Sequence, residues 1–487
     1  MQDLKDRPID TDKSLGLDAI NRATELPDHG KKPGNLFTTA MSYVLIGAIF
    51  IFATECILNL AGLGEEEIFK LDPDLGTRHM TNKKVTWRKE GYACSYLNHL
   101  GMREKDATQS KAKGVYRIAL LGDSQVESIQ VRLEQSFGQI LQKKLSQSLG
   151  RPVEILNFGV SGYSTVQEYL LMKTEVMRWA PDMVIVGYDG RDIFENWATP
   201  DQMLSNVRPM ALKLPGQALV IDKTSVTSWR KSMRGRYMCQ AELLRQNSRI
   251  WGLVCQAETE LGFHNPVYKW IVNYFTDPGK SARQLQKDLS SGLLLAECQK
   301  AVSKQLSDLI KIDQSSSFNV QYYIDDKKPQ EKLGGLPGSS KDPLAAGQKL
   351  QNKTKPVPVV TQSSRVFLKL LSETLEALFA DMQQIAKAHD AKLVIVGLPS
   401  RATLAALPSM SGFEQGLDHK GELTLVENQA KKLGLPYIDA QAAAEKYSEK
   451  DQLALFYSAH LTPKGQQYLA DQLYLPIKDL ILQDQSK

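Results

Sequence analysis

The chain has 487 residues, of which 42% are hydrophobic, and its formal net charge is +5 at neutral pH. Because single domains typically have about 100–200 residues, this length predicts one large domain with additions. The small net charge argues against nucleic acid, and the sequence has neither paired zinc-type cysteines nor a Gly-Lys-Ser phosphate loop. We therefore expect no nucleic-acid partner.

An apolar segment near the N-terminus, residues 36–63, carries a single charge, Glu55. It is long enough to cross the ~30 Å hydrocarbon layer as a helix, whereas a cleaved signal peptide would have a shorter leader than the 35 residues found here. A buried core helix is the other alternative. We expect an uncleaved anchor in the inner membrane.

Charges on the two sides of this segment predict its orientation. Lys31 and Lys32 precede it and three glutamates, residues 65–67, follow it. The positive-inside rule then makes residues 1–35 a cytoplasmic tail and places the rest in the periplasm or outside the cell. In an oxidising compartment four of the five cysteines can form two disulfides or stay as free buried thiols, and both alternatives are open. These are Cys94, Cys239, Cys255 and Cys298, while Cys56 lies in the apolar segment.

A connector, residues 64–113, leads to five short β-branched segments. Such runs without polar alternation are typical of strands that are covered on both faces. Helical periodicity at residues 126–149 and 165–179 separates the first three, and this alternation predicts a three-layer α/β fold around a parallel sheet. The strand segments are residues 115–123, 153–160, 182–190, 392–400 and 436–440.

Residues 201–365 interrupt this alternation and are too long for an ordinary connection. We interpret them as a largely helical insertion between two halves of one domain, residues 114–200 and 366–487. Helical periodicity is found at residues 229–262 and 284–312, and a Gly/Pro/Ser/Lys-rich loop at 327–358. A long amphipathic helix, residues 364–389, follows the insertion.

Ser124 lies in the run LLGDSQVES, where the first strand turns into a helix. Open α/β sheets bind ligands at this edge, and a helix N-terminus offers unpaired N–H groups to developing negative charge. Alternatively, Asp123 and Ser124 only cap the helix. The second strand ends in NFGVSGYST, whose Gly159 and Gly162 let the backbone turn N–H groups toward a ligand, although such glycines are also ordinary turn residues.

His460 is the candidate base for a serine nucleophile. Thr462 and Pro463 are suited to the N-cap and first position of a helix, which places His460 in the loop before it. A serine hydroxyl needs a base to take its proton, and a neutral imidazole is the usual one. The seven histidines show no metal-ligand spacing, so we expect no metal site.

GDSQ at Ser124, the Asn-x-Gly-x-x-Gly-x-x-Thr run from Asn157 to Thr165 and HLTPKG after His460 resemble the SGNH/GDSL hydrolase superfamily. The segment SYLNHLGMREKD, residues 95–106, is similar to a leader of membrane-anchored members. The resemblance implies a flavodoxin-like sheet, Ser124 as nucleophile and first oxyanion donor, Gly162 as second donor and His460 as base. It leaves the insertion unexplained.

Two positions depart from the family pattern. Arg191 stands where the family has the asparagine that is the third oxyanion donor; arginine also donates, but its longer side chain changes the geometry. The acid that normally precedes the histidine is missing, because Tyr457 and Ser458 occupy those places. Asp451, Asp439 or a backbone carbonyl is an alternative support for the imidazole.

The sequence therefore predicts a serine esterase that needs no cofactor and acts on an O-acyl group of a cell-envelope glycan or lipid. An O-acetyltransferase of an extracellular polysaccharide, or an inactive envelope binding or assembly protein, is the alternative. Residues 208–249 contain nine basic and two acidic residues. They form either a solvated helical face or a patch for anionic glycan or lipid headgroups.

Overall fold

The computed structural model describes residues 36–63, 67–88, 90–190, 192–196, 208–213, 216, 218–231, 233–254, 257, 362–401 and 419–485. Two compact units divide at residue 64 and are described separately. The helices expected at residues 284–312 and the loop expected at 327–358 lie outside the described residues, as does the cytoplasmic tail.

Helix α2, Leu36–Ala61, is the described element of the N-terminal unit. Its 26 residues rise about 39 Å at 1.5 Å per residue, which exceeds the ~30 Å of a hydrocarbon layer. Its Phe37–Ala61 stretch is long and apolar enough to cross a membrane, and 6% of its most apolar window is buried. The expected apolar helix is thus confirmed by length and composition, while its orientation stays a prediction.

Five parallel strands form the central sheet of the second unit in the order β11-β10-β7-β5-β6. All five coincide with the segments predicted from the sequence. Their bounds are β5 Tyr116–Gly122, β6 Val153–Asn157, β7 Met183–Tyr188, β10 Lys392–Gly397 and β11 Tyr437–Asp439. Numbered along the chain, this is the flavodoxin-like order 2-1-3-4-5.

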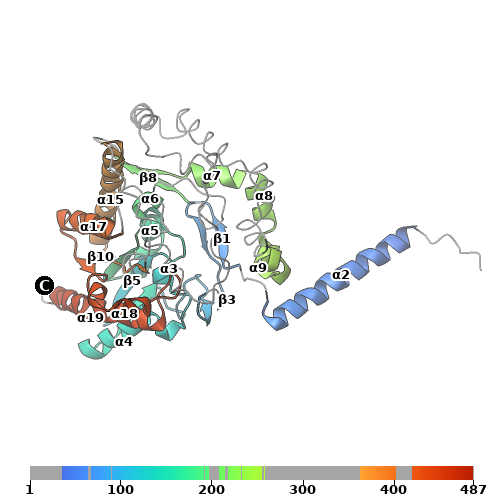
Figure 1. Ribbon diagram of the computed structural model, residues 1–487, viewed down its shortest axis with the longest axis horizontal. Coiled ribbons are helices and arrows are strands. Elements are labelled where there is room, and N and C mark those ends of the chain that lie inside the picture. Colours follow the sequence, from blue (N-terminus) through green and yellow to red (C-terminus); the bar gives the residue numbers. More distant parts are fainter. Residues whose placement is uncertain are drawn as a thin grey trace, which may run out of the picture. The chain divides into compact units, whose positions relative to one another are not determined.

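Helices cover both faces of the sheet, which confirms the three-layer α/β prediction (Figure 1). Successive side chains of a strand point to opposite faces, so Ile118 and Leu120 join one core cluster while Ala119 and Leu121 join the other. The first cluster is covered by α4 Phe137–Leu149 and α19 Pro463–Gln485. The second is covered by α5 Thr165–Thr174, α15 Gln362–Ala388 and α17 His419–Lys432.

The helix expected over residues 126–149 is wrong as a continuous element. One turn, α3 Ser124–Glu127, ends at Ser128, whose φ of 57° is left-handed. The 3₁₀ turn η1 Leu133–Gln135 precedes α4. Further short elements are η2 Val176–Trp179, α6 Asp192–Glu195, η5 Ala444–Lys446 and α18 Glu449–Leu453.

The connector contains two antiparallel hairpins that the sequence did not predict. They are β1 Phe69–Asp72 with β2 Gly76–His79, and β3 Lys83–Trp87 with β4 Ala93–Leu97. Side chains of β4 alternate between buried and exposed, as expected of a strand with one covered face. The connector is therefore folded structure of the second unit rather than a simple link.

The first described element pair of the insertion is a hairpin, which lies before the helical periodicity expected from residue 229. β8 Met210–Lys213 pairs with β9 Leu219–Asp222, and β8 packs on α15. Three short helices follow, and the last two lie within residues 229–262, where helical periodicity was expected. They are α7 Thr224–Lys231, α8 Met233–Gln240 and α9 Glu242–Asn247. Cys94 and Cys239 are free thiols, and Cys255 and Cys298 lie outside the described residues.

Replacing Phe379 with alanine is expected to lower the free energy of unfolding by about 3–5 kcal/mol. The side chain is fully buried on α15, and its ring packs edge-on against Tyr188 at 6.5 Å between centroids. Denaturant unfolding followed by circular dichroism measures the loss. Lys369→Ala on the same helix is the control, because its side chain is 77% exposed and the change should stay within about 0.5 kcal/mol. Equal midpoints for both variants would contradict the packing of α15 on the sheet.

Candidate active site

Strand β5 lies between β6 and β7, so the chain leaves its carboxyl end at the topological switch point of the sheet. Ligands of open α/β sheets bind in the crevice at this point. Ser124 is placed there, one residue after the N-cap Asp123, whose Oδ1 accepts the N–H of Gln125 at 2.9 Å. Gly122 has no room for a Cβ because Val126 packs directly against it. The close packing fixes the backbone that carries Ser124.

The loop after β6 is tied to the same turn by Asn157. Its Nδ2 donates to the carbonyl of Val126 at 2.8 Å, and its Oδ1 accepts the N–H of Gly159 at 2.8 Å. Gly162 in this loop has a left-handed φ of 77°. Within the described part of the chain, the backbone N–H groups of Ser124 and Gly162 donate no hydrogen bond. Both positions that the resemblance assigns to oxyanion donors therefore carry available donors.

The loop that carries His460 is held at each backbone carbonyl from residue 457 to residue 461. Arg401 donates to the carbonyls of Tyr457 and Ser458, at 3.0 and 2.7 Å, and the N–H of Tyr457 donates to the carbonyl of His460 at 2.8 Å. The remaining two carbonyls receive side-chain amides from the segment after Ser124: Gln125 donates to Ala459 at 3.2 Å and Gln130 donates to Leu461 at 3.0 Å.

These bonds bring the serine and histidine segments together, although the two lie more than 300 residues apart in sequence. The residue after Ser124 is hydrogen-bonded to the residue before His460. Thr462 caps the last helix as expected, because its Oγ1 accepts the N–H of Gly465 at 3.2 Å. Arg191, expected as a third oxyanion donor, lies outside the described residues.

A carboxylate that the sequence did not indicate contacts His460. Glu90, in the five-residue loop between β3 and β4, accepts from Nδ1 of the imidazole through Oε2. Asp439 instead accepts the N–H groups of Gln441 and Ala442, so the expectation that it supports the imidazole is wrong. The same holds for Asp451, which binds Ser448 and Lys464.

Glu127, the last residue of the α3 turn that begins with Ser124, forms a second buried network. Its Oε1 contacts Nε2 of His79 at 2.9 Å, and its Oε2 accepts the N–H of Ser161 at 3.1 Å and also the Ser161 hydroxyl. Burial opposes ionisation, but His79, Ser161 and the nearby Arg103 outweigh it and lower the pKa of Glu127. Glu127 thus fixes the loop of Gly162 relative to Ser124.

Arg103 anchors the connector to this network. It is 1% exposed, and its guanidinium donates to the carbonyl of Glu127 at 3.2 Å and to the Ser95 hydroxyl at 3.0 Å. Burial lowers the pKa of Arg103 to about 10 despite the opposing charge of Glu127, so the group is still charged at neutral pH. Arg103 lies in the leader-like segment, residues 95–106, that the sequence analysis singled out. No sequence signal indicated Glu90 or His79.

Three buried carboxyls interact electrostatically: Asp123 of the turn that carries Ser124, Glu168 and Asp192. Burial raises the pKa of each, and their mutual repulsion adds to the effect for both aspartates. For Glu168 the pKa is raised to about 8. Both carboxyl oxygens of Glu168 are buried without a hydrogen-bond partner among the described residues. The geometry favours a neutral, protonated acid at this position.

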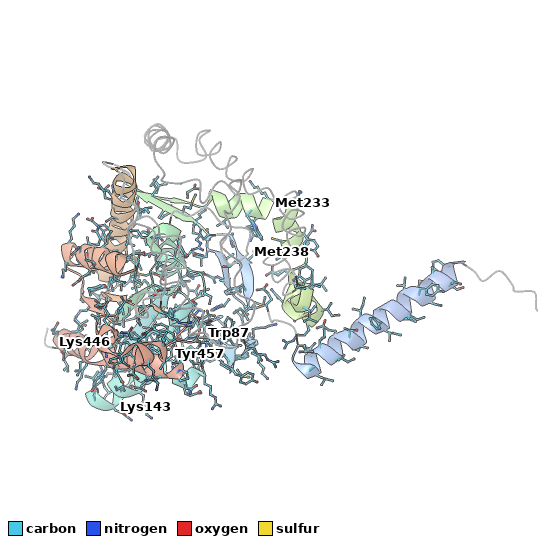
Figure 2. The ribbon with its side chains drawn as sticks, viewed as in Figure 1. Trp87, Lys143, Met233, Met238, Lys446 and Tyr457 are labelled. Atoms are coloured by element: carbon cyan, nitrogen blue, oxygen red, sulfur yellow. The ribbon has the colours of Figure 1, made fainter. Side chains whose placement is uncertain are left out.

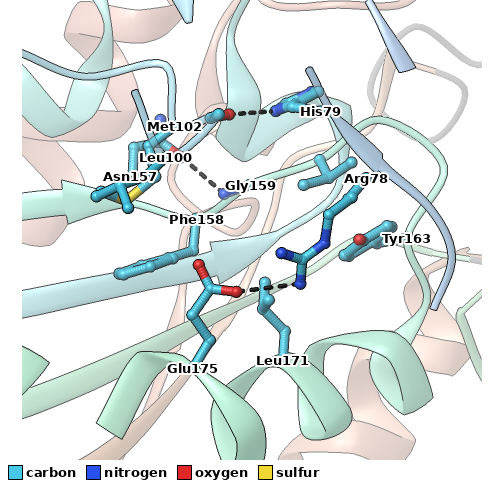
Figure 3. Close-up of a pocket in the computed structure, with 12 residues that line it drawn as sticks. Arg78, His79, Leu100, Met102, Asn157, Phe158, Gly159, Tyr163, Leu171 and Glu175 are labelled. Carbon is cyan, nitrogen blue, oxygen red and sulfur yellow. Dashed lines mark hydrogen bonds and ion pairs between the residues drawn. The ribbon is translucent and has the colours of Figure 1, made fainter. Parts of the chain in front are cut away.

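A cavity of about 30 Å³ lies beside the loop after β6, lined by residues of β2, the connector and the α5 segment (Figure 3). Arg78 and Glu175 form an ion pair at 3.0 Å across one side of it. This volume fits about one or two water molecules and not an ester substrate. Neither Ser124 nor His460 lines it, so the cavity is separate from the candidate site.

No protein-family model matches the chain, and no curated protein matches it. Among solved structures, a GDSL-like lipase from Bacteroides thetaiotaomicron aligns over 77% of this chain and 93% of its own, at 10% identity and a TM-score of 0.31. A catalytic variant of an acetylxylan esterase from Geobacillus stearothermophilus covers 75% and 94%, at 8% identity and a TM-score of 0.31. The acetyl xylan esterase AlAXEase covers 74% and 98%, at 10% identity and a TM-score of 0.32. At these identities and TM-scores the likeness supports no argument about this chain, so the site is argued from the geometry alone.

Glu168→Gln is expected to change how stability depends on pH. The folded-state pKa of Glu168, about 8, lies above the ordinary value of 4.5, so the folded protein holds a proton that the unfolded chain releases. This contribution is fully present below pH 4.5 and is lost as pH rises toward 8, by about 1.4 kcal/mol per pH unit at most. Relative to wild type, the glutamine variant should therefore become more stable as pH rises, as measured by denaturant unfolding between pH 5 and 8.

Glu427→Gln on α17 serves as the control for Glu168→Gln, because this glutamate is 35% exposed and pairs with Lys431. Its unfolding free energy should follow that of wild type across the pH range. Parallel curves for Glu168→Gln and wild type would show that Glu168 is ionised in the folded state.

Proposed function

We propose that this chain is a serine esterase of the SGNH/GDSL type that removes an O-acyl group from a cell-envelope glycan or lipid. One observation carries the proposal: the serine turn and the histidine loop meet at the carboxyl end of β5, joined through Gln125 and Ala459. Such a meeting of a hydroxyl and an imidazole segment is what nucleophilic catalysis requires.

In the proposed reaction Ser124 attacks the acyl carbonyl while His460 takes the hydroxyl proton. Nδ1 of His460 faces Glu90, which leaves Nε2 as the nitrogen for Ser124. The unengaged N–H groups of Ser124 and Gly162 are suited to bind the oxyanion of the tetrahedral intermediate. His460 then returns the proton to the leaving alcohol, and water releases the acyl group from Ser124.

The apolar helix α2 supports an envelope substrate. A helix of this length and composition before the catalytic unit is suited to hold an enzyme at a membrane. Lys31 and Lys32 on one side and the glutamates at residues 65–67 on the other favour a cytoplasmic N-terminus and a periplasmic or extracellular site. Acylated glycans and lipids are ester substrates present in that location.

The rival hypothesis is a binding or assembly protein that has lost its chemistry. An esterase needs a carboxylate on its imidazole to orient the base, whereas a binding protein has no such requirement. The contact between Glu90 and His460 therefore supports the enzyme over the binding protein. The unoccupied donors of Ser124 and Gly162 support it as well.

A fluorophosphonate probe is expected to label the wild-type protein and to leave Ser124→Ala unlabelled, because only an activated serine attacks the phosphorus. His460→Gln should slow labelling at least about 10²-fold through loss of the general base. Ser148→Ala on α4 is the matched control, since its hydroxyl bonds the carbonyl of Leu145 and the phenol of Tyr474 and no residue of the candidate site. In-gel fluorescence and intact mass measure the adduct. Equal labelling of wild type and Ser124→Ala would exclude Ser124 as the nucleophile.

A further inference from the structure

We propose that Glu90 is the acidic residue that orients the catalytic imidazole and stabilises its positively charged form. It is supplied by the connector instead of by the histidine loop. The proposal rests on the proposed function and deepens it by naming the third member of the site. Because Glu90 acts through His460, it is a positioning residue. The order along the chain is then Glu90, Ser124, His460.

The contacts of Glu90 are directed at the histidine loop. Oε2 accepts from Nδ1 of His460, while Oε1 accepts the N–H of Ala459 at 2.7 Å and the hydroxyl of Ser458. The carboxylate side chain is 9% exposed. Three donors from consecutive residues thus converge on one carboxylate, an arrangement that fixes both the ring and the loop that carries it.

The departure from the family pattern and the replacement acid are linked. Ser458 stands in the region where the family places its acid, and its hydroxyl donates to Glu90. Burial favours the neutral acid, but the hydrogen bonds from Ser458, His460 and Ala459 and the nearby imidazole outweigh it and lower the pKa of Glu90. The group is therefore an ionised carboxylate at neutral pH, as support of an imidazolium requires.

The tip of the β3–β4 hairpin is docked on the histidine loop by shape as well as by charge. The ring of Trp87 meets the His460 ring edge-on at 6.5 Å between centroids. Gly91 has a left-handed φ of 67°, and a Cβ there would overlap the ring of Tyr457. Trp87 and Tyr457 lie close together in the view of Figure 2. Glu90 thus lies between Trp87 and Gly91, which both contact the histidine loop.

The other end of the same hairpin is fixed to the serine segment. Val85 and Leu97 are buried in a cluster with Ile129, five residues after Ser124. Arg103 adds hydrogen bonds to Ser95 of β4 and to the carbonyl of Glu127. The hairpin therefore bridges the nucleophile and the base, and Glu90 is positioned relative to both.

Glu90 acts electrostatically in this reaction and neither gains nor loses a proton. As the Ser124 Oγ–C bond forms, the hydroxyl proton moves to Nε2 of His460 and the ring becomes an imidazolium. Glu90 stays ionised throughout, holds the other ring proton on Nδ1 and stabilises the positive charge. When the acyl–oxygen bond to the leaving alcohol breaks, the proton on Nε2 passes to that alcohol. Water then attacks the acyl–serine ester, and His460 takes a proton from the water and returns it to the Ser124 oxygen as the carboxylic acid leaves.

Hydrolysis of p-nitrophenyl acetate by the full-length protein in detergent tests this role. Glu90→Gln should lower kcat by about 10²–10⁴-fold with KM changed less than about threefold, because glutamine keeps the volume but not the charge. Glu90→Asp should recover at least about tenfold of that loss, since it restores the carboxylate. Asp106→Asn is the matched control: Asp106 pairs with His99 in the same connector but is 68% exposed.

A merely structural role would give a different pattern. Glu90→Gln and Glu90→Asp would then lose activity together with thermal stability. Equal kcat for wild type and Glu90→Gln would overturn the proposal, as would a Glu90→Asp variant no more active than Glu90→Gln at equal stability.

The proton position on His460 separates this inference from the proposed function. With only seven histidines, ¹⁵N-histidine spectra can be assigned using His460→Gln. We expect the proton on Nδ1 in wild type and a mixture of tautomers in Glu90→Gln. If this holds while Ser124 fails to react with the ester, the proposed function falls and the positioning of His460 by Glu90 stands. An unchanged tautomer in Glu90→Gln overturns the inference whatever the activity.

Discussion

Parallel pairing of β5 with both β6 and β7 is the constraint on which the site depends. Because all five strands run in one direction, their carboxyl ends lie at one edge, where the loops carrying Ser124 and Gly162 also lie. Side-chain amides then complete the site: Asn157 joins the two strand loops and Gln125 joins the histidine loop. The backbone topology brings the segments near, and polar side chains set their final positions.

Local patterns predicted the sheet and the turn that carries Ser124 well. Buried strands such as residues 116–122 have continuous apolar runs, and Gly-Asp-Ser at a strand end is recognisable without long-range information. The helix after Ser124 was predicted too long, because apolar spacing alone does not reveal the left-handed Ser128. That residue is held by hydrogen bonds to Gln125 and to Gln466 of the last helix, 338 residues away.

Glu90 shows why the rest of the site was not predictable. It is 370 residues from His460, and its short strands have too few residues to show a clear period. A carboxylate in a turn, preceded by two basic residues and followed by a glycine, looks like any solvated loop residue. Its partners come from the folded histidine loop, and the neighbouring Gly91 packs on Tyr457 of that loop. The aspartates closer in sequence were reasonable candidates, but their loops use them for local hydrogen bonds.

The direction of the pKa shift of each carboxyl group around the site depends on its partners rather than on how deeply it is buried. Glu127 and Glu168 are both fully buried, yet hydrogen bonds and opposite charges lower the pKa of the first while burial without a partner raises that of the second. Glu90 belongs with Glu127, because each has an imidazole on one side and a serine hydroxyl on the other. Ionised carboxylates thus stand where two loops must be held together, whereas Glu168, whose pKa is raised, has no hydrogen-bond partner among the described residues and interacts electrostatically with Asp123 of the turn that carries Ser124.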